Sequence, residues 1–176
     1  LSATTERITL GTSVMVLPYH DPVGLAKYTA TLDAMSGGRL ILGVGAGALA
    51  EEFVALGIPM SRRGALTDEG IAVMKDLWTN PNPDYHGGRY RFADLKFSPQ
   101  PVQKPHVPLW VGGSSSGALA RAARSGDGWH PTSLPAADYA TGCDRVRSLA
   151  AEAGRDPAAL EMSIRFDVDV TAEPSS

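Results

Sequence analysis

The sequence predicts an α/β fold with about five parallel strands. Short apolar runs typical of strands alternate along the chain with amphipathic runs typical of helices. The 19 glycines and 13 prolines lie mainly where these runs end, as expected of residues that terminate regular structure. Because strands separated by helices pair in parallel through right-handed crossovers, this order is consistent with part of a (β/α)8 barrel or with an open sheet.

Composition is that of an ordinary globular protein and excludes several classes of function. The 176 residues are enough for one domain with a core, and 43% of them are hydrophobic. A net charge of -3 gives no electrostatic reason to expect a nucleic acid or an anionic membrane as partner. Cys143 is the lone cysteine, which excludes an internal disulfide and predicts a small core residue. With no signal peptide and no apolar run of about 20 residues, the expected location is the cytoplasm.

The first predicted elements are a strand, a helix and a second strand. Residues 8–17 form the first strand, which ends at Pro18. Asp21-Pro22 is a preferred helix start, and Gly37-Gly38 ends the helix. Residues 39–44 form the second strand. Helical spacing predicts that the first helix buries Leu25, Tyr28, Leu32 and Met35.

Two further helices and a hairpin are predicted in the middle of the chain. A short helix over 51–56 precedes a loop over 59–64 and a longer helix over about 66–78. Residues 85–92 predict a β-hairpin that turns at a Gly-Gly pair, and the proline-rich stretch 98–108 predicts an extended connection. The buried stripe of the longer helix is expected to consist of Leu66, Ile71, Met74, Leu77 and Trp78.

The stretch Leu109–Arg124, LWVGGSSSGALARAAR, predicts a strand buried on both faces, a glycine-serine turn and a helix. Gly112-Gly113 allows a tight turn, and Ser114 or Ser115 is a natural N-cap. Free amides and hydroxyls then converge where the helix dipole is positive, an arrangement that suits a phosphate group. An ordinary glycine-rich turn capped by serine is the alternative, and this stretch alone leaves both open.

The last predicted elements are a strand over 128–131, a helix over about 136–153, one helical turn after Asp156-Pro157, and a closing strand. The helix is expected to bury Tyr139, Cys143, Val146 and Leu149. The closing strand is predicted from the alternation of Met162, Ile164, Phe166, Val168 and Val170.

No pattern of side chains identifies a catalyst, and we expect no metal site. Residues 43–48, GVGAGA, match a dinucleotide-binding fingerprint. They lack the later strand that ends in an acidic residue, so an NAD site is a weak alternative. The four histidines lack metal-ligand spacing and are expected to be scattered over the surface; they are His20, His86, His106 and His130. His20 and His130 stand out because each follows a strand at the end where barrel enzymes hold their chemistry. The catalytic residues are unknown, and a bound cofactor is expected to carry any reaction.

Four stretches of the sequence carry a family resemblance. They are ERITLGTSVMVLPYHDP, LDAMSGGRLILGVGAG, EEFVALGIP with the arginine-bearing loop after it, and PLWVGGSSSGALARAARSGDGW. In this order they resemble the luciferase-like monooxygenase family, and most of all its branch of coenzyme F420-dependent oxidoreductases. The resemblance implies a partial (β/α)8 barrel comprising strands three to seven and the small hairpin. Residues 1–176, which begin at Leu1 rather than Met, are therefore expected to form one barrel domain that is incomplete at both ends.

The resemblance also implies where the cofactor lies. In the family, cofactors bind at the carboxyl-terminal mouth of the barrel. Ser13-Val14 corresponds to a strand bulge with a cis peptide bond that backs the ring. Gly45-Ala46-Gly47 resembles the loop beside the ring and the ribityl chain. Gly112-Gly113 and Ser114-Ser115 resemble the cradle of the phosphate.

Three positions depart from the family pattern. His20-Asp21 stands where Arg-His is frequent, and Ala48 stands where the loop often ends in tryptophan. Ala46 stands where bacterial luciferase has a phosphate-binding arginine. These departures argue against light emission.

The expected function is an oxidoreductase in which F420, or alternatively FMN, exchanges hydride with a small organic substrate. If the cofactor is FMN and its reduced form reacts with oxygen, the protein is expected to be a monooxygenase. Two rivals are a non-catalytic relative that only binds flavin and a fragment without activity of its own. The substrate is unknown, and a homodimer is left open.

Overall fold

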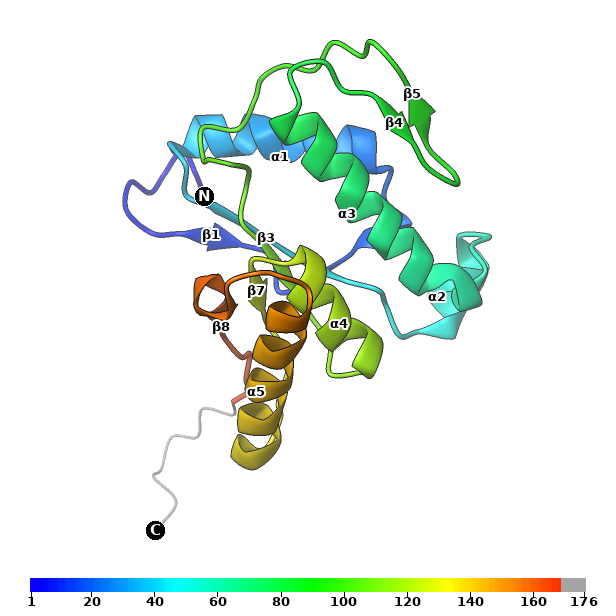
Figure 1. Ribbon diagram of the computed structural model, residues 1–176. Coiled ribbons are helices and arrows are strands. Elements are labelled where there is room, and N and C mark those ends of the chain that lie inside the picture. The colour runs from blue at the N-terminus through cyan, green and yellow to red at the C-terminus, as the bar shows by residue number, and fades with distance from the viewer. Residues whose placement is uncertain (169–176) are drawn as a thin grey trace.

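The computed structural model describes residues 1–168, which form a curled half-barrel of parallel strands with helices on its outer face (Figure 1). The strand order is β1-β3-β6-β7-β8, and β2 pairs with β3 beyond β1. Every pairing in this sheet is parallel. Since β1 and β2 are two parts of one interrupted strand, the prediction of an α/β fold with about five parallel strands is confirmed.

The elements lie close to the expected ranges. The sheet consists of β1 (Leu10–Gly11), β2 (Met15–Val16), β3 (Leu40–Gly45), β6 (Leu109–Val111), β7 (Gly128–Trp129) and β8 (Glu161–Met162). The predicted hairpin is antiparallel and consists of β4 (Tyr85–His86) and β5 (Arg91–Phe92). The α-helices are α1 (Pro22–Ser36), α2 (Ala50–Ala55), α3 (Arg63–Thr79), α4 (Ser116–Ser125) and α5 (Ala136–Glu152). Single 3-10 turns are η1 (Leu17–Tyr19), η2 (Met60–Arg62) and η3 (Pro157–Ala159).

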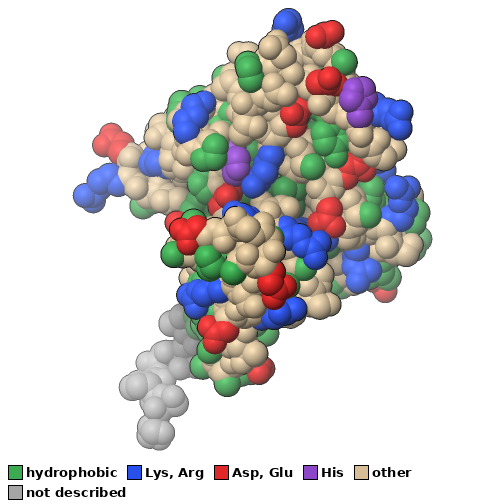
Figure 2. Space-filling model, in the orientation of Figure 1, with side chains coloured by type: hydrophobic (Ala, Val, Ile, Leu, Met, Phe, Trp, Pro, Cys, Tyr) green, Lys and Arg blue, Asp and Glu red, His purple; other side chains and the backbone are tan. Residues whose placement is uncertain are grey.

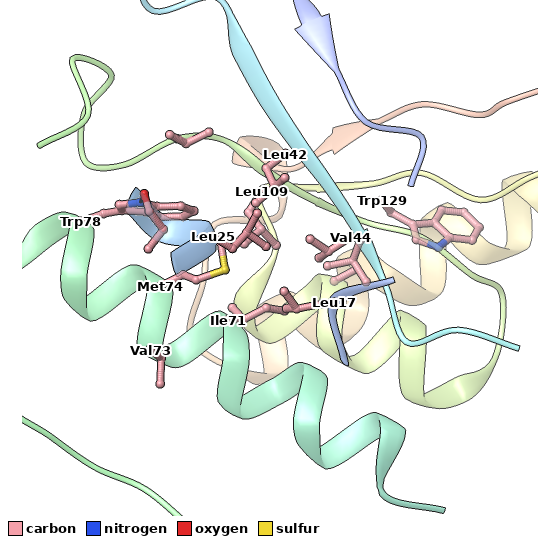
Figure 3. Packing of buried hydrophobic residues seen from close by; sticks show 14 of the residues in the cluster. Leu17, Leu25, Leu42, Val44, Ile71, Val73, Met74, Trp78, Leu109 and Trp129 are labelled. Carbon is pink, nitrogen blue, oxygen red and sulfur yellow. Dashed lines mark hydrogen bonds between the residues drawn. The ribbon is translucent and has the colours of Figure 1, made fainter. Parts of the chain in front are cut away.

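The main core lies between the outer face of the sheet and helices α1, α3 and α4. Leu42 of β3 and Leu109 of β6 are buried there, close to Ile71 and Met74 of α3 (Figure 3). All five residues of the predicted α3 stripe are buried.

The predicted first strand is interrupted rather than continuous. The peptide bond between Ser13 and Val14 is cis, and it separates β1 from β2. The strand also ends before Leu17, which begins η1. The interruption occurs where the Thr12 hydroxyl donates to the Gly43 carbonyl at 2.7 Å and so replaces a regular ladder contact.

The expected buried face of α1 is wrong at two positions. The side chains of Tyr28 and Met35 are 76% and 71% exposed. The helix instead packs on α3 through Ala26 and Ala30, both fully buried, because small side chains let the Trp78 indole donate to the Ala26 carbonyl at 3.0 Å. A large residue on the same face would prevent this approach.

Two boundaries and the burial of one residue also differ from prediction. Helix α3 begins at Arg63, inside the expected loop, because η2 leads directly into it. Trp110 of β6 is only half-buried, whereas its neighbours Leu109 and Val111 are buried in the core. The closing strand is limited to β8, and Phe166 and Val168 are exposed because few residues cover this edge of the sheet. Val170 lies outside the described residues.

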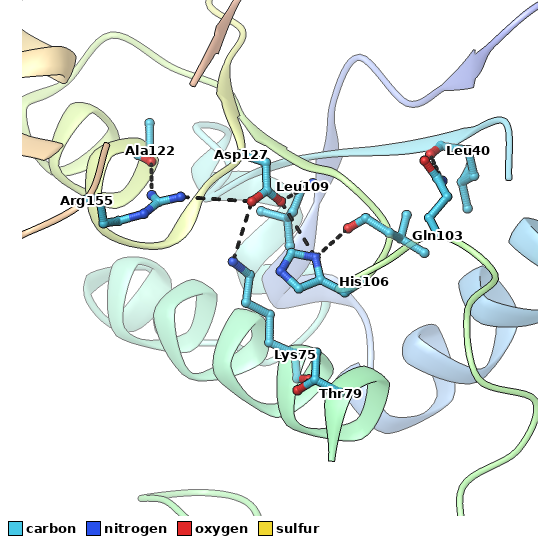
Figure 4. Close-up of polar contacts among 10 residues, drawn as sticks. Leu40, Lys75, Thr79, Gln103, His106, Leu109, Ala122, Asp127 and Arg155 are labelled. Carbon is cyan, nitrogen blue, oxygen red and sulfur yellow. Dashed lines mark hydrogen bonds and ion pairs between the residues drawn. The ribbon is translucent and has the colours of Figure 1, made fainter. Parts of the chain in front are cut away.

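One polar cluster lies inside the fold, at the opposite ends of the strands from the site described below. The Asp127 carboxylate accepts from the Leu109 amide at 2.8 Å and lies 3.7 Å from the His106 ring (Figure 4). Lys75 and Arg155 each lie 4.0 Å from the same carboxylate. His106 is therefore buried, contrary to the expectation of surface histidines, because it completes this cluster.

The surface seen in Figure 2 carries acidic and basic side chains interspersed with one another. In the part of the chain that the structure describes, no helix is both long and apolar enough to cross a membrane. Among residues 1–168, no group of three His, Cys, Asp or Glu side chains is arranged to hold a metal ion.

Candidate functional site

A pocket of 530 Å³ lies at the carboxyl ends of β2, β3 and β6; we call it the mouth pocket. It joins segments that are far apart in the sequence. Every predicted site residue except Ser13 lines it. Its lining consists of Val14, Val16, Gly45, Ala46, Gly47, Ala48, Met60, Arg63, Gly112, Gly113, Ser114, Ser115, Ala118 and Arg121.

The Val14 side chain lies close to Gly45 at the end of β3 and to Gly112 after β6. A Cβ atom at Gly45 would lie 2.9 Å from this side chain, and one at Gly112 would also lie 2.9 Å from it. Real Cβ atoms do not approach other atoms so closely, so a side chain at either position would force Val14 to shift. The bulge at Ser13-Val14 and the glycines at the two strand ends therefore form one packed unit.

The turn after β6 leads directly into the N-terminus of α4. Gly113 has a φ of 95°, and its carbonyl accepts from the Trp129 indole at 2.8 Å. Ser115, rather than Ser114, is the N-cap, because its hydroxyl accepts from the Ala118 amide at 3.2 Å. Residues Gly112–Ser115 thus lie where the positive end of the α4 dipole meets the pocket.

Two arginines line the pocket, and their charges are balanced differently. Arg121 is 8% exposed and donates to the Asp68 carboxylate at 2.6 and 3.2 Å. Arg63 donates to the Met60 carbonyl at 3.2 Å. Among residues 1–168, no carboxylate lies within ion-pair distance of Arg63. The pocket therefore carries one cation that the described part of the protein does not neutralise.

Ser13 does not line the mouth pocket but is tied to it through His130. The Ser13 hydroxyl lies 2.7 Å from Nε2 of His130, and the Ser163 hydroxyl lies 2.8 Å from Nδ1. Burial and the nearby Arg165 charge lower the pKa of His130, which favours the neutral imidazole. Neutral His130 can donate to one hydroxyl and accept from the other, so it connects the bulge to β8.

The sequence anticipated some of these residues and missed others. His130 was singled out by its position after a strand, whereas its partners lie 117 and 33 positions away and gave no signal. Arg63 belonged to a loop already noted for its arginines, but the sequence assigned it no role. His20, which was singled out with His130, lines a separate pocket of 220 Å³ beside η1.

The model of the luciferase-like monooxygenase family matches residues 1–175. The chain belongs to this family. The glycine-serine turn and the interruption at Ser13-Val14 are therefore parts of a luciferase-like half-barrel.

Several relatives resemble the chain over most of its length. An uncharacterized protein of Mycobacterium tuberculosis is 39% identical over 95% of this chain and 58% of its own. The FMNH(2)-dependent dimethylsulfone monooxygenase of Pseudomonas putida is 33% identical over 88% of this chain and 43% of its own. The F420-dependent glucose-6-phosphate dehydrogenase of Intrasporangium calvum is 32% identical over 96% of this chain and 58% of its own. The chain thus spans about half the length of these luciferase-like relatives.

Solved structures agree with this assignment. The crystal structure of the monooxygenase RslO1 from Streptomyces bottropensis superposes with a TM-score of 0.81 at 30% identity. The match covers 92% of this chain and 50% of that one. Luciferase-like proteins include oxidoreductases and monooxygenases, with F420 and with FMN among the cofactors that the names of these relatives give.

Proposed function

We propose that the mouth pocket binds a phosphorylated deazaflavin or flavin and that the protein is an oxidoreductase. One observation carries the proposal: Val14, Gly45–Gly47 and Gly112–Ser115, from three distant segments, line a single pocket beside the N-terminus of α4. The names of the relatives support it, because they include one F420-dependent and one FMNH(2)-dependent enzyme.

The residues of the pocket fit such a ligand. Its 530 Å³ is within the usual range of about 300–1,000 Å³ for small-molecule sites. Gly112–Ser115 and the α4 N-terminus would hold the phosphate. Val14 presents an apolar surface for the ring, and the loop Gly45–Gly47 has almost no side chains to obstruct it.

F420 is the cofactor that we favour, and FMN is the alternative. When bound, F420 supplies hydride exchange with an organic substrate, whereas reduced FMN also reacts with oxygen. The chain's own part is to bind the phosphate, orient the ring against Val14 and exclude water. A small organic molecule is the proposed substrate.

A binding titration tests this proposal. We expect the purified protein to bind F420, detected by a change in cofactor fluorescence, more tightly than FMN. Ser114→Ala should weaken binding of the phosphorylated cofactors about 3- to 10-fold and leave binding of unphosphorylated riboflavin unchanged. Ser116→Ala is the matched control, because Ser116 is exposed and does not line the pocket. Binding of FMN without binding of F420 would show that FMN is the cofactor. Binding of neither would refute the proposal.

A further inference from the structure

The pocket of 220 Å³ that His20 lines is separate from the mouth pocket; we call it the side pocket. It is bounded by η1, the start of α1, the first half of α3 and the end of the hairpin turn. It shares no lining residue with the mouth pocket. Binding of a cofactor in the mouth pocket therefore leaves the side pocket without a role.

The buried part of the side pocket is apolar. Leu17 and Leu66 line it and are only 1% and 8% exposed. Gly70 of α3 lies between these side chains and the pocket's other walls, and a Cβ atom there would lie 3.1 Å from Leu17. An aliphatic group fits this surface, because the transfer of apolar area out of water favours binding.

Two opposite charges line the same pocket without pairing with each other. Asp21 caps α1 by accepting from the Gly24 amide at 2.9 Å through Oδ1, and its Oδ2 accepts no hydrogen bond from residues 1–168. The Arg89 guanidinium lies over the Tyr90 ring, 5.7 Å from its centroid, and has no ion-pair partner within those residues. A guanidinium stacked in this way keeps its N–H donors for a ligand.

The hairpin is held so that both charges lie near one phenol. The Glu69 carboxylate of α3 accepts from the amides of Arg89 and Tyr90 at 2.7 and 3.1 Å, and so fixes the hairpin beside α3 (Figure 1). Burial raises the pKa of the Tyr90 hydroxyl, while the Arg89 charge lowers it and the Asp21 charge raises it further. The hydroxyl therefore senses both the cation and the anion of the side pocket.

We propose that the side pocket binds a small zwitterion with an aliphatic side chain, of the chemical class of the aliphatic α-amino acids. The ligand's carboxylate pairs with Arg89 and its ammonium pairs with Asp21, while its side chain covers Leu17 and Leu66. A simple anion is repelled by Asp21 and a simple cation by Arg89, so a ligand with both charges is favoured over either. The volume of 220 Å³ is below the range of about 300–1,000 Å³ of larger ligands, which limits the occupant to a small molecule.

The test compares L-leucine with analogues that each lack one recognised part. They are 4-methylpentanoate, which lacks the ammonium group, 3-methylbutylamine, which lacks the carboxylate, and glycine, which lacks the side chain. Dissociation constants are measured by nuclear magnetic resonance titration of the purified protein without cofactor. We expect leucine to bind at about 1 millimolar, the acid and the amine about 3- to 5-fold more weakly, and glycine at least about 10-fold more weakly.

Two variants assign each charge of the ligand to one side chain. Arg89→Gln should weaken leucine binding about 3- to 5-fold and abolish the difference between leucine and the amine, which has no carboxylate to lose. Asp21→Asn should abolish the difference between leucine and the acid, and it keeps the cap of α1 because asparagine caps as well as aspartate. Arg91→Gln is the matched control: Arg91 is exposed on the same hairpin and does not line the side pocket.

The outcomes decide the inference without reference to the cofactor. Failure of leucine to bind at up to about 10 millimolar would overturn it, as would equal affinities for leucine, the acid and the amine. An effect of Arg91→Gln as large as that of Arg89→Gln would also overturn it, because binding would then lie elsewhere. Thermal unfolding of the variants shows whether a lost affinity reflects a lost fold. The proposed function is unaffected by any of these results, because none of the probes carries a ring or a phosphate.

Discussion

Val14 is the residue on which the geometry of the mouth pocket depends most directly. Its side chain lies against Gly45 of β3 and Gly112 after β6, and neither position has room for a Cβ atom. Because these glycines come from different strands, Val14 sets how closely the strand ends approach each other. A single added methyl group is therefore expected to change both stability and binding.

We predict that Gly112→Ala lowers the free energy of unfolding by about 1–3 kcal/mol, because the new Cβ overlaps Val14. Urea denaturation measures the change, and cofactor affinity should fall with it. Gly24→Ala is the control: a Cβ there meets only the Asp21 carboxylate at 3.7 Å, so helix α1 should gain about 0.5–1 kcal/mol. Equal stability of Gly112→Ala and the wild type would refute this packing.

His130 is predicted to make stability depend on pH. Burial and the Arg165 charge lower its pKa in the folded state, so the unfolded chain binds more protons near and below about pH 6.5. The free energy of unfolding should therefore fall as the pH drops from about 6.5 toward the lower pKa of the folded state. The groups facing the ring are the Ser13 and Ser163 hydroxyls and Arg165, which is itself paired with Asp167.

The contribution of His130 to the pH dependence of stability is measured by comparing the wild type with a variant that lacks this histidine. Urea unfolding of the wild type and of His130→Asn is compared at neutral pH and at about pH 5, where other groups titrate alike in both proteins. The variant should lose less stability on acidification than the wild type. A loss in the variant as large as in the wild type would contradict the assignment.

At the scale of elements, the connection over residues 98–108 depends on a single carboxylate. This segment has no strand ladder, and its path is fixed by the fully buried Asp33 of α1. Asp33 accepts from the amides of Val102 and Gln103 at 2.8 and 3.0 Å, and from the Gln103 side chain at 2.6 Å. The connection positions β6, so Asp33 supports the site indirectly.

We predict that Asp33→Ala lowers the free energy of unfolding by about 3 kcal/mol, because buried donors lose their acceptor. Chemical denaturation measures this loss. Asp144→Ala, on the exposed face of α5, should change stability by less than about 0.5 kcal/mol. A similar effect of both substitutions would show that the Asp33 contacts carry no net stability.

Elements with a strong local signal were predictable from the sequence. The α3 stripe, the hairpin and the serine cap of α4 follow from spacing, paired glycines and capping chemistry. The exposure of Tyr28 and Met35 was not predictable from the sequence, because it depends on how closely α1 approaches α3. The closing strand was predicted, but it is shorter than expected, because alternation alone does not reveal whether a neighbour covers the strand.

The residues of the candidate site were likewise predictable only where the local sequence carries a motif. Gly112–Ser115 and Gly45–Gly47 have motifs of their own, and both segments line the mouth pocket. The roles of these residues in binding a cofactor stay predictions. Arg63 was missed because its importance comes from what its neighbour Arg121 already contacts, which is a property of the fold and not of the local sequence.

For the whole molecule, the principal feature is a sheet that does not close. Its outermost strands are β1 and β8, and within residues 1–168 neither has a partner on its outer side (Figure 1). Unpaired backbone groups along such edges are templates for association with another chain. The exposed Ile8 and Phe166 near these edges add apolar surface.

We predict that the protein of residues 1–176 associates reversibly as its concentration rises from about 1 to about 100 micromolar. Sedimentation velocity measures this as an increase in weight-average mass. Ile8→Lys, which adds a charge beside the β1 edge, should weaken the association. A monomer throughout this range would show that the open edges are protected.

The fluorescence of Trp129 can report changes at the glycine-serine turn. Its indole is buried between the Gly113 carbonyl and Gly142 of α5, where a Cβ atom would overlap the ring, and it stacks on Tyr139 at 5.5 Å. We expect a ligand that contacts Gly113 to change the fluorescence emission of Trp129, even when the ligand itself does not absorb light.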